Sequence, residues 1–453
     1  MATLLNSVPK PGEARETGWV DRLFTKEGYS PEYQELKFTL HRKLLDRINL
    51  EALSSMAGER VRAEIRAAVA KLVEEEKTPL SLVEKDRVIE EILDEVFGLG
   101  PLEPLLGDPT VSDILVTTPK KVYVERGGKL YRTPVEFKDD AHLLRIIEKV
   151  VSRVGRRVDE SSPLVDARLP DGSRVNAAIP PVAVDGPLLS IRRFGRHAMR
   201  GEDLAARLAM TEGMLELLKA CVKARLNILI CGGTGSGKTT LLNALSGYIP
   251  EDERIVTIED AAELKLQQTH VARMETRPAN VEGVGAIHIR QLVINALRMR
   301  PDRIIVGEVR SEEALDMLQA MNTGHDGSLT TVHANTPRDG LGRLEVMVGM
   351  ANSNMGIRSI RQQIASAVNL FVQVARFSDG ARRITHITEV VGMEQDVITL
   401  QDIFVFDKTG ITESGKVTGR FRATGIRPKF YERLKASGIT LSQQLFQTVV
   451  EIN

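Results

Sequence analysis

The sequence predicts an α/β protein whose C-terminal half carries a largely parallel β-sheet with helices on both faces. Two observations lead to this prediction. From Met210 onward, short apolar runs alternate with segments of helical periodicity. The first apolar run leads into a glycine-rich loop at 232–240, and the apolar residues of a helix follow this loop directly. Strands are expected at 226–231, 254–258 and 303–306.

The rest of the chain divides by its residue patterns. Residues 1–30 are rich in glycine, proline and charge without any period, and we expect a disordered tail. Apolar residues recur three times at helical spacing within 31–99, which predicts a bundle of short helices. Residues 100–195 mix strand and helix patterns and are expected to form an α+β domain, joined by a linker at 196–209 to the domain at 210–453.

Local patterns give the expected elements of the α+β domain and of the C-terminal end. Gly127-Gly128 is expected to be a hairpin turn. A second hairpin is expected near the C-terminus, within what otherwise looks like a polar tail. Strands are predicted at 113–117, 121–125, 174–179, 188–194, 402–407 and 416–423, and a helix at 141–153.

Composition argues against several classes of protein. Lysine plus arginine and aspartate plus glutamate number 61 each, and aromatic residues make up only 4%, so we expect no direct contact with nucleic acid. The two cysteines, Cys221 and Cys231, are expected to be reduced and buried. No secretion signal or membrane-spanning run is visible, which favours a cytoplasmic protein that reaches a membrane only through a partner.

The glycine-rich loop matches the phosphate-binding pattern G-x-x-x-x-G-K-[ST], which indicates ATP binding. Backbone N–H groups in such a loop point at phosphate oxygens, and the following helix adds the positive end of its dipole. Lys238 is expected to reach the β- and γ-phosphates, and the Thr239 hydroxyl to ligate Mg²⁺. The alternative is a glycine-rich turn that binds no ligand. The expected nucleotide contacts are Gly233, Thr234, Gly235, Ser236, Gly237, Lys238, Thr239 and Thr240.

Three strands downstream end in polar residues, and ligands bind beyond the carboxyl ends of strands in open parallel sheets. Glu259 is a candidate general base that orients the attacking water, and Glu308 a candidate acid on the Mg²⁺ side. The aspartate that usually precedes such an acid is Gly307 here. His333 could sense the γ-phosphate, although a lone histidine is more often structural. Considered alone, this segment is better explained as an acidic strand end followed by a helix that Asp260 caps.

Arginines are dense around these elements and in the preceding α+β domain, where Arg168, Arg174 and Arg192 are candidates. Phosphoryl-transfer sites often use an arginine to stabilise the transition state. Any single arginine could instead form a solvated salt bridge, and spacing does not say which one reaches nucleotide.

Asp407-Lys-Thr-Gly410 resembles the phosphorylation motif of P-type ion pumps. Such pumps need transmembrane helices, which the sequence lacks. Aspartate, threonine and glycine also suit a turn between strands, so we interpret this segment as a turn.

The phosphate-binding loop, the Glu-Asp strand end, the Gly-Glu strand end and the histidine strand follow one another in the order of the type II/type IV secretion ATPase superfamily, which the sequence resembles. The similarity is greatest to CpaF/TadA-type ATPases of tight-adherence (Flp) pilus systems. It is carried by Leu297–Arg310 and Met317–Asn335, and upstream by Asp166–Asn176 and Ser190–Phe194.

This resemblance implies a homohexamer in which a PAS-like α+β domain, preceded here by the helical bundle, packs over a RecA-like motor domain with nucleotide between the two. It assigns Lys238 and Thr239 to ATP and Mg²⁺, Glu259 to the catalytic base, Glu308 to the Walker B acid and His333 to the histidine box. It also places the three arginines near the phosphates.

The function that the resemblance implies is ATP-driven assembly or retraction of a pilus through an inner-membrane platform protein, at the cytoplasmic face of that membrane. The alternatives are an ATPase for DNA transfer or effector export, and a nucleotide-binding regulator that is not a motor.

Overall fold

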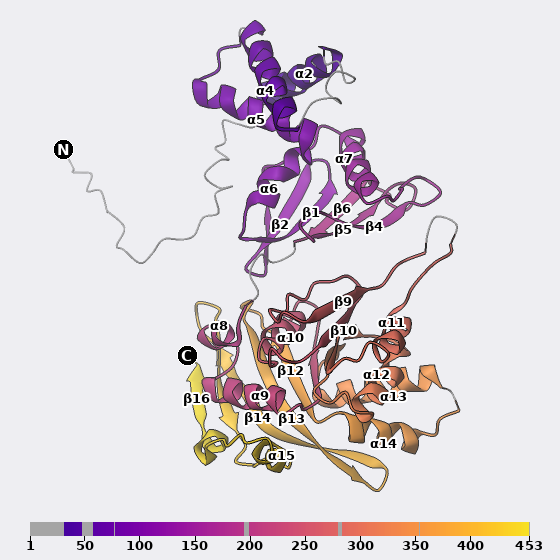
Figure 1. The fold of residues 1–453 in the computed structure, drawn as a ribbon. Coiled ribbons are helices and arrows are strands. Elements are labelled where there is room, and N and C mark those ends of the chain that lie inside the picture. The colour runs from indigo at the N-terminus through magenta and orange to yellow at the C-terminus, as the bar shows by residue number, and fades with distance from the viewer. Residues whose placement is uncertain are drawn as a thin grey trace, which may run out of the picture. The chain divides into compact units, whose positions relative to one another are not determined.

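The computed structural model describes residues 31–47, 58–76, 78–193, 199–279, 283–352 and 354–452. The expected tail at 1–30 lies outside this part of the chain. The chain divides into two compact units, Met1–Arg196 and His197–Asn453, here called the N-terminal and C-terminal units (Figure 1).

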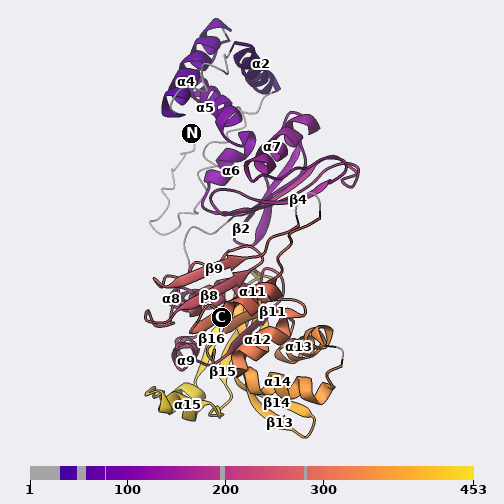
Figure 2. The ribbon, with the colours of Figure 1, turned by 45° about the vertical axis from the view of Figure 1, so that its right-hand side comes forward.

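Three helices open the N-terminal unit: α2 (Pro31–Arg47), α4 (Gly58–Glu75) and α5 (Leu82–Phe97). The three helices lie together (Figure 2). Leu40, Val69 and Ile92 contribute to the small apolar core that they share. Helix α5 starts at a capping box, in which the Ser81 hydroxyl accepts the Glu84 N–H and the Glu84 carboxylate accepts the Ser81 N–H. The helical spacing seen in the sequence is confirmed for all three.

A six-stranded antiparallel sheet follows, in the order β3-β2-β1-β6-β5-β4. The predicted hairpin is confirmed, because Gly127 and Gly128 turn with positive φ between β2 and β3. Strand β4 was not predicted, and it places Arg168 on the sheet edge. The elements are η2 (Gly100–Leu102), α6 (Glu103–Gly107), β1 (Val111–Thr118), β2 (Lys121–Arg126), β3 (Lys129–Arg132), α7 (Asp140–Arg153), β4 (Leu164–Arg168), β5 (Arg174–Ala178) and β6 (Leu188–Arg192).

Helix α7 ties the three helices to the sheet by closing the C-terminal end of α5. The Lys149 ammonium donates to the carbonyls of Glu95 and Val96, at 3.2 and 2.9 Å, and Arg153 donates to the Phe97 carbonyl at 2.9 Å. The last carbonyls of a helix lack intrahelical partners, so cationic side chains stabilise them.

The segment 196–209 differs from the expected linker. Its described part contains a short helix, α8 (Gly201–Ala206), and Leu204 and Ala205 pack against the core of the C-terminal unit. A methyl group on Gly201 would lie 2.3 Å from the Tyr248 hydroxyl, so this helix is packed closely against its neighbours. A run of only six residues gave no helical period to detect.

The C-terminal unit is built on a ten-stranded sheet with the order β16-β15-β14-β13-β12-β7-β11-β10-β8-β9. The six strands from β12 to β9 are parallel to their neighbours, and the other four continue the sheet with antiparallel pairs. The expected parallel sheet is therefore one part of a longer mixed sheet. Its strands are β7 (Ile228–Gly232), β8 (Ile255–Glu259), β9 (Val271–Glu275), β10 (Arg303–Val309), β11 (Leu329–His333), β12 (Leu370–Arg376), β13 (Arg382–Glu394), β14 (Val397–Ile411), β15 (Val417–Ala423) and β16 (Val449–Ile452).

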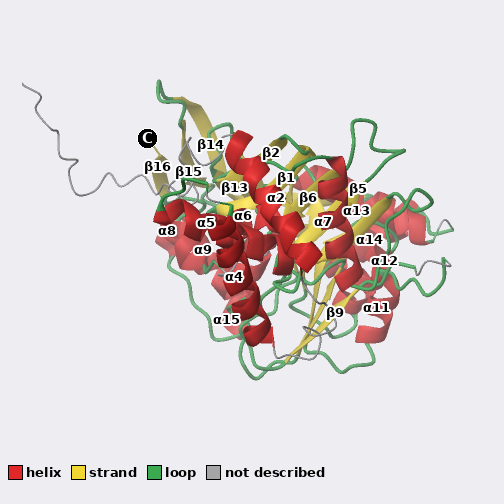
Figure 3. Ribbon diagram, turned by 90° about the horizontal axis from the view of Figure 1, so that it is seen from above, coloured by secondary structure: helices red, strands yellow, loops and turns green. Residues whose placement is uncertain are grey.

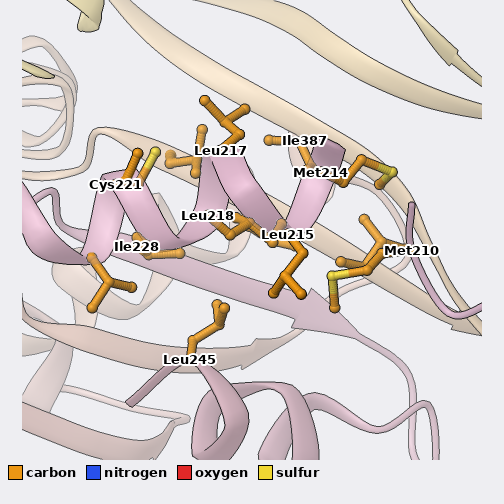
Figure 4. Packing of buried hydrophobic residues seen from close by; sticks show 14 of the residues in the cluster. Met210, Met214, Leu215, Leu217, Leu218, Cys221, Ile228, Leu245 and Ile387 are labelled. Atoms are coloured by element: carbon orange, nitrogen blue, oxygen red, sulfur yellow. The ribbon is translucent and has the colours of Figure 1, made fainter. Parts of the chain in front are cut away.

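Helices cover both faces of this sheet, as predicted. On one face, Leu218 and Cys221 of α9 lie beside Ile228 of β7 and Leu245 of α10 (Figure 4). On the other, α12, α13 and α14 lie together over the parallel strands (Figure 3). The helices are α9 (Glu212–Lys223), α10 (Lys238–Ser246), α11 (Ile289–Ala296), α12 (Glu313–Asn322), α13 (Pro337–Ala351), α14 (Ile357–Ala367), α15 (Tyr431–Ala436) and the short η3 (Gln443–Gln447).

Both cysteines are free and buried in these cores, as expected. Burial raises the pKa of the Cys221 thiol and raises that of Cys231 to about 12, so neither is a reactive thiolate. Within the described residues, no helix is both long and apolar enough to cross a bilayer.

The turn interpretation of Asp407–Gly410 is wrong. These residues lie inside β14 and pair with β15, and the turn comes later, where the Gly415 N–H donates to the Thr412 carbonyl. Asp407 accepts from Arg422 at 2.9 Å and from Arg420 at 3.4 Å across the hairpin. A cross-strand ion pair, which local turn propensity does not reveal, keeps this polar stretch in the sheet.

Candidate nucleotide site at the strand ends

The candidate site begins where the buried strand β7 ends and α10 begins at Lys238. Gly235 and Gly237 have φ of +69° and +98°, a backbone conformation that favours glycine. The Ser236 hydroxyl donates to the Gly233 carbonyl at 2.8 Å and closes the loop on itself. No atom lies within 4 Å of the position that a methyl group on Gly233 would take. The loop is therefore a cradle with open space, which fits a phosphate group.

The Lys238 side chain folds back over this cradle. Its ammonium donates to the Gly233 carbonyl at 3.2 Å and lies 3.8 Å from Oε1 of Glu308. Burial lowers the pKa of Lys238, and the nearby Glu308 carboxylate opposes this shift. Thr239 lies half-buried on the first turn of α10, whereas Thr234 and Thr240 are exposed.

Glu259 ends strand β8 and is only 3% exposed. Its Oε2 accepts the backbone N–H groups of Glu263 and Leu264, at 2.7 and 2.8 Å. Its Oε1 is buried and has no hydrogen-bond partner. Burial raises the pKa of Glu259, although the two N–H groups favour the ionised form. A buried carboxylate with one unused oxygen fits a general base that receives a water proton.

Glu308 lies in a line of alternating charges that begins at Lys238. Its Oε2 accepts Nε of Arg310 at 2.8 Å, and Arg310 in turn lies 3.2 Å from Oδ2 of Asp260. Burial would lower the pKa of Arg310, but the two carboxylates outweigh it and raise that pKa. Asp260 thus pairs with an arginine, and no helix that it could cap follows β8.

The side chains present fit a magnesium ion held mainly by nucleotide and water. No group of three or more His, Cys, Asp or Glu side chains in the described residues is arranged to hold a metal alone. Thr239 and Glu308 offer one hydroxyl and one carboxylate, and Mg²⁺ in nucleotide sites keeps several waters and phosphate ligands. His333 ends β11 opposite Gly232, so it stands beside the start of the loop.

Sequence reasoning missed two arginines that lie against the loop. Arg376 ends β12 and pairs with Arg382, which begins β13. Nε of Arg382 donates to the Gly235 carbonyl at 2.9 Å, and a methyl group on Gly235 would lie 3.4 Å from the Arg376 guanidinium. The signal that could have found them is a strand parallel to β7 that ends in an arginine.

The three arginines predicted in the N-terminal unit form one row across its sheet. Arg168 is directly opposite Arg174, and Arg174 is directly opposite Arg192. Arg192 also donates to Asp113 at 3.1 Å. Like charges placed opposite one another are unfavourable, so the row concentrates positive charge where an anion would stabilise it. Because the row and the phosphate loop belong to different units, contact between them stays a prediction.

Comparison with known proteins identifies the family of the chain. The family model described as "Type II/IV secretion system protein" matches residues 95–424. A putative conjugal transfer protein of Mycobacterium tuberculosis is 42% identical over 299 residues, covering 65% of this chain and 84% of the relative. Protein VirB11 of Agrobacterium fabrum is 30% identical over 311 residues, covering 62% and 89%.

Among solved structures, the VirB11 ATPase of the Brucella suis type IV secretion system is 27% identical, with a TM-score of 0.34, and covers 65% of this chain and 97% of that one. The family match alone spans well over half of the sequence. The chain therefore belongs to the type II/IV secretion system protein family.

Proposed function

We propose that this chain hydrolyses ATP with Mg²⁺ and works as a homohexameric motor at the cytoplasmic face of a membrane. The observation that carries the proposal is the grouping of Lys238, Glu308 and Glu259 at one edge of the parallel strands. A cradle for phosphate, a lysine and a buried base with a free oxygen are the parts that hydrolysis of a phosphoanhydride needs.

In this mechanism the loop N–H groups and the start of α10 bind the β- and γ-phosphates. Lys238 leaves the Gly233 carbonyl and bonds to phosphate oxygens. Glu259 holds the attacking water on its unpaired Oε1 and takes its proton. Thr239 and Glu308 would hold Mg²⁺, which when bound would supply positive charge that stabilises the phosphates.

The arginines of the N-terminal unit would stabilise charge on the γ-phosphate and hold the two units together until phosphate leaves. Release of phosphate would then free the units to move, which is a ligand-biased closure of the rigid-body kind. Arg168, Arg174 and Arg192 fit this role because their row is already preformed on one sheet.

Two machines remain candidates for the work that this motion performs. The names of the relatives favour transfer of DNA or effectors by a type IV secretion system. The motif resemblance favours assembly or retraction of a tight-adherence pilus through an inner-membrane platform protein. Deletion of the gene separates them: loss of surface filaments under the electron microscope supports the pilus, and loss of conjugation with filaments intact supports transfer.

The enzymatic proposal is tested by ATP turnover of the purified full chain. We expect Mg²⁺-dependent phosphate release that stops with EDTA and in Lys238→Ala. The matched control is Lys435→Ala, which removes an exposed lysine on α15 and leaves turnover unchanged. Full activity of Lys238→Ala, or a wild-type chain that binds ATP without turnover, would contradict the proposal; the second result would favour a regulator. Mass measurement of the native particle tests the hexamer.

A further inference from the structure

Strand β10, which carries Glu308, pairs irregularly with β11 around Gly307 and Glu308. Strands β10 and β11 pair in parallel at Ile305 with Leu329 and at Val306 with Thr330, but the next pair is Val309 with Val332. Two residues of β10, Gly307 and Glu308, therefore stand opposite the single residue Thr331. Such a bulge bends the strand and changes the direction of its side chains, and bulges are frequent beside active sites.

The Thr331 hydroxyl holds this bulge from one side. It donates to the Gly307 carbonyl at 2.7 Å, and Thr331 is almost fully buried. Gly307 is half-buried, and a carbonyl shielded from water needs a hydrogen-bond donor. The hydroxyl supplies that bond between neighbouring strands at the point where the ladder is interrupted.

Glu259 lies against the other side of Gly307. A methyl group on Gly307 would lie 3.1 Å from Cγ and 3.6 Å from Cβ of Glu259. Glu259 has little freedom to retreat, because its Oε2 is held by the N–H groups of Glu263 and Leu264. This contact gives a physical reason for glycine at a position where an aspartate is usual: a side chain here would press on Cγ of Glu259 on the neighbouring strand.

We propose that Gly307 and Thr331 form a positioning pair for both carboxylates of the site. The Thr331 hydroxyl fixes the bulge that directs Glu308 toward Lys238, and the bare Cα of Gly307 leaves the space that Glu259 occupies. Neither residue touches substrate in this role. The inference rests on the proposed ATP hydrolysis and adds the residues that set its geometry.

The neighbouring residue Thr330 provides a matched control. Thr330 is as buried as Thr331, lies on the same strand, and its hydroxyl has no hydrogen-bond partner. Thr331→Val and Thr330→Val remove the same atom from adjacent positions, and Thr331→Ser restores the hydroxyl without the methyl group. If Thr331 only stabilised the fold, the three variants would differ in melting temperature and would not differ in kcat.

The experiment measures kcat, KM and the dissociation constant for ATP in the full chain, with thermal melting as a check of folding. We expect Thr331→Val to lower kcat roughly 10- to 100-fold, since misplacement of a catalytic group by about 1 Å costs that much. ATP affinity should stay within about twofold, because the loop and Lys238 are unchanged. Thr331→Ser should recover most of kcat, and Thr330→Val should match wild type.

Gly307→Ala gives a second and independent measurement if Thr331→Val does not fold. We expect lower kcat with ATP binding retained, and an acidic limb of the pH profile displaced to higher pH. The displacement follows because a shifted Glu259 loses N–H bonds that hold its pKa down. A wild-type kcat in folded Thr331→Val or folded Gly307→Ala would overturn the proposed pair. An equal loss of kcat in Thr330→Val would overturn it as well. Absence of turnover in the wild-type chain overturns the proposed function and the pair with it.

Discussion

Two buried glutamates, one in each unit, have pKa values shifted in opposite directions. Glu95 at the end of α5 is 7% exposed, and Glu259 at the end of β8 is 3% exposed. Burial would raise the pKa of Glu95, but its hydrogen bond to His142 and the charge of Lys37 outweigh burial and lower that pKa. The pKa of Glu259 is raised, because its two N–H donors do not compensate burial. Both carboxylates are buried, so the difference between their pKa shifts comes from their hydrogen-bond and charge partners.

Glu95 has one hydrogen-bond partner and one cationic neighbour, and its Oε1 accepts no hydrogen bond. Nε2 of His142 lies 2.9 Å from one carboxylate oxygen, and the Lys37 ammonium lies 3.9 Å from the other. Because Nδ1 of His142 accepts the Lys138 N–H, the ring proton sits on Nε2 and is donated to Glu95. The cluster joins α2, α5 and α7. Oε1 lacks a hydrogen-bond partner in both glutamates, so the contrast lies in charge: His142 and Lys37 stabilise the ionised form of Glu95, and burial disfavours that of Glu259. A buried carboxylate whose charge is compensated serves the fold, and one whose pKa stays raised is a candidate for function.

The largest expected effect is at Glu259. Glu259→Gln should lower ATP turnover by about 10³-fold, as expected for loss of a general base, while ATP binding persists. Its folded pKa is raised, so its contribution to stability is present below the unfolded pKa and is lost as pH rises through the folded value. At neutral pH the neutral amide should therefore melt at the same temperature as wild type or higher. A clearly lower melting temperature of Glu259→Gln would show that Glu259, like Glu95, stabilises the fold.

Glu95→Gln should have the opposite effect on stability and destabilise the protein. We expect the N-terminal unit to lose about 2 kcal/mol of unfolding free energy at neutral pH, because the charge-assisted hydrogen bond to His142 is lost, while Lys37 keeps Glu91 at 3.3 Å. The folded pKa of Glu95 is depressed, so this contribution exists above the unfolded pKa and disappears as pH falls through the folded value. Denaturant titration at neutral and acidic pH measures it, with Glu64→Gln on the exposed face of α4 as control. Equal stability of Glu95→Gln and wild type would contradict the assignment.

Asp94 gives a smaller effect that depends on pH. Burial and the neighbouring Glu103 and Glu90 raise its pKa to about 7. Its stability contribution is therefore full below the unfolded pKa and lost as pH rises through about 7. Asp94→Asn should stabilise the N-terminal unit at pH 8 by roughly 1 kcal/mol, allowing for solvent screening, and leave it unchanged near pH 4. Melting curves at both values decide this, and an equal gain at both would refute it.

The smallest effect is expected at Arg382, whose bond to the Gly235 carbonyl is exposed. Arg382→Gln should raise the KM for ATP about two- to fivefold through a less ordered loop, with kcat nearly unchanged. Arg420→Gln removes an exposed arginine from β15 and serves as control. A large fall in kcat would show that Arg382 acts on the reaction itself.

Sequence patterns predicted the features that depend on neighbours in the chain. The helices of the N-terminal unit, the Gly127-Gly128 hairpin and the strand–loop–helix around Lys238 follow from periodicity and from residue types with special backbone preferences. Burial of both cysteines followed from their apolar surroundings.

The features that were missed depend on distant residues. Glu95 and His142 are 47 positions apart, and Arg382 reaches a carbonyl 147 positions away. Asp407 stays in a strand through arginines on the next one. The reason for Gly307 became visible only when Glu259, from another strand, was placed against it. The local propensities of residues do not reveal contacts between positions that are far apart in the chain.

The burial of both cysteines has a practical consequence for observing the motor. The chain has only two thiols, and both are shielded in cores and held protonated. Maleimide dyes should therefore leave the native chain unlabelled. One cysteine introduced at exposed Glu64 and one at exposed Lys435 would carry a donor and an acceptor, and both native cysteines could stay in place. Energy transfer between them, followed through ATP addition and phosphate release, would report the distance between the two units in real time.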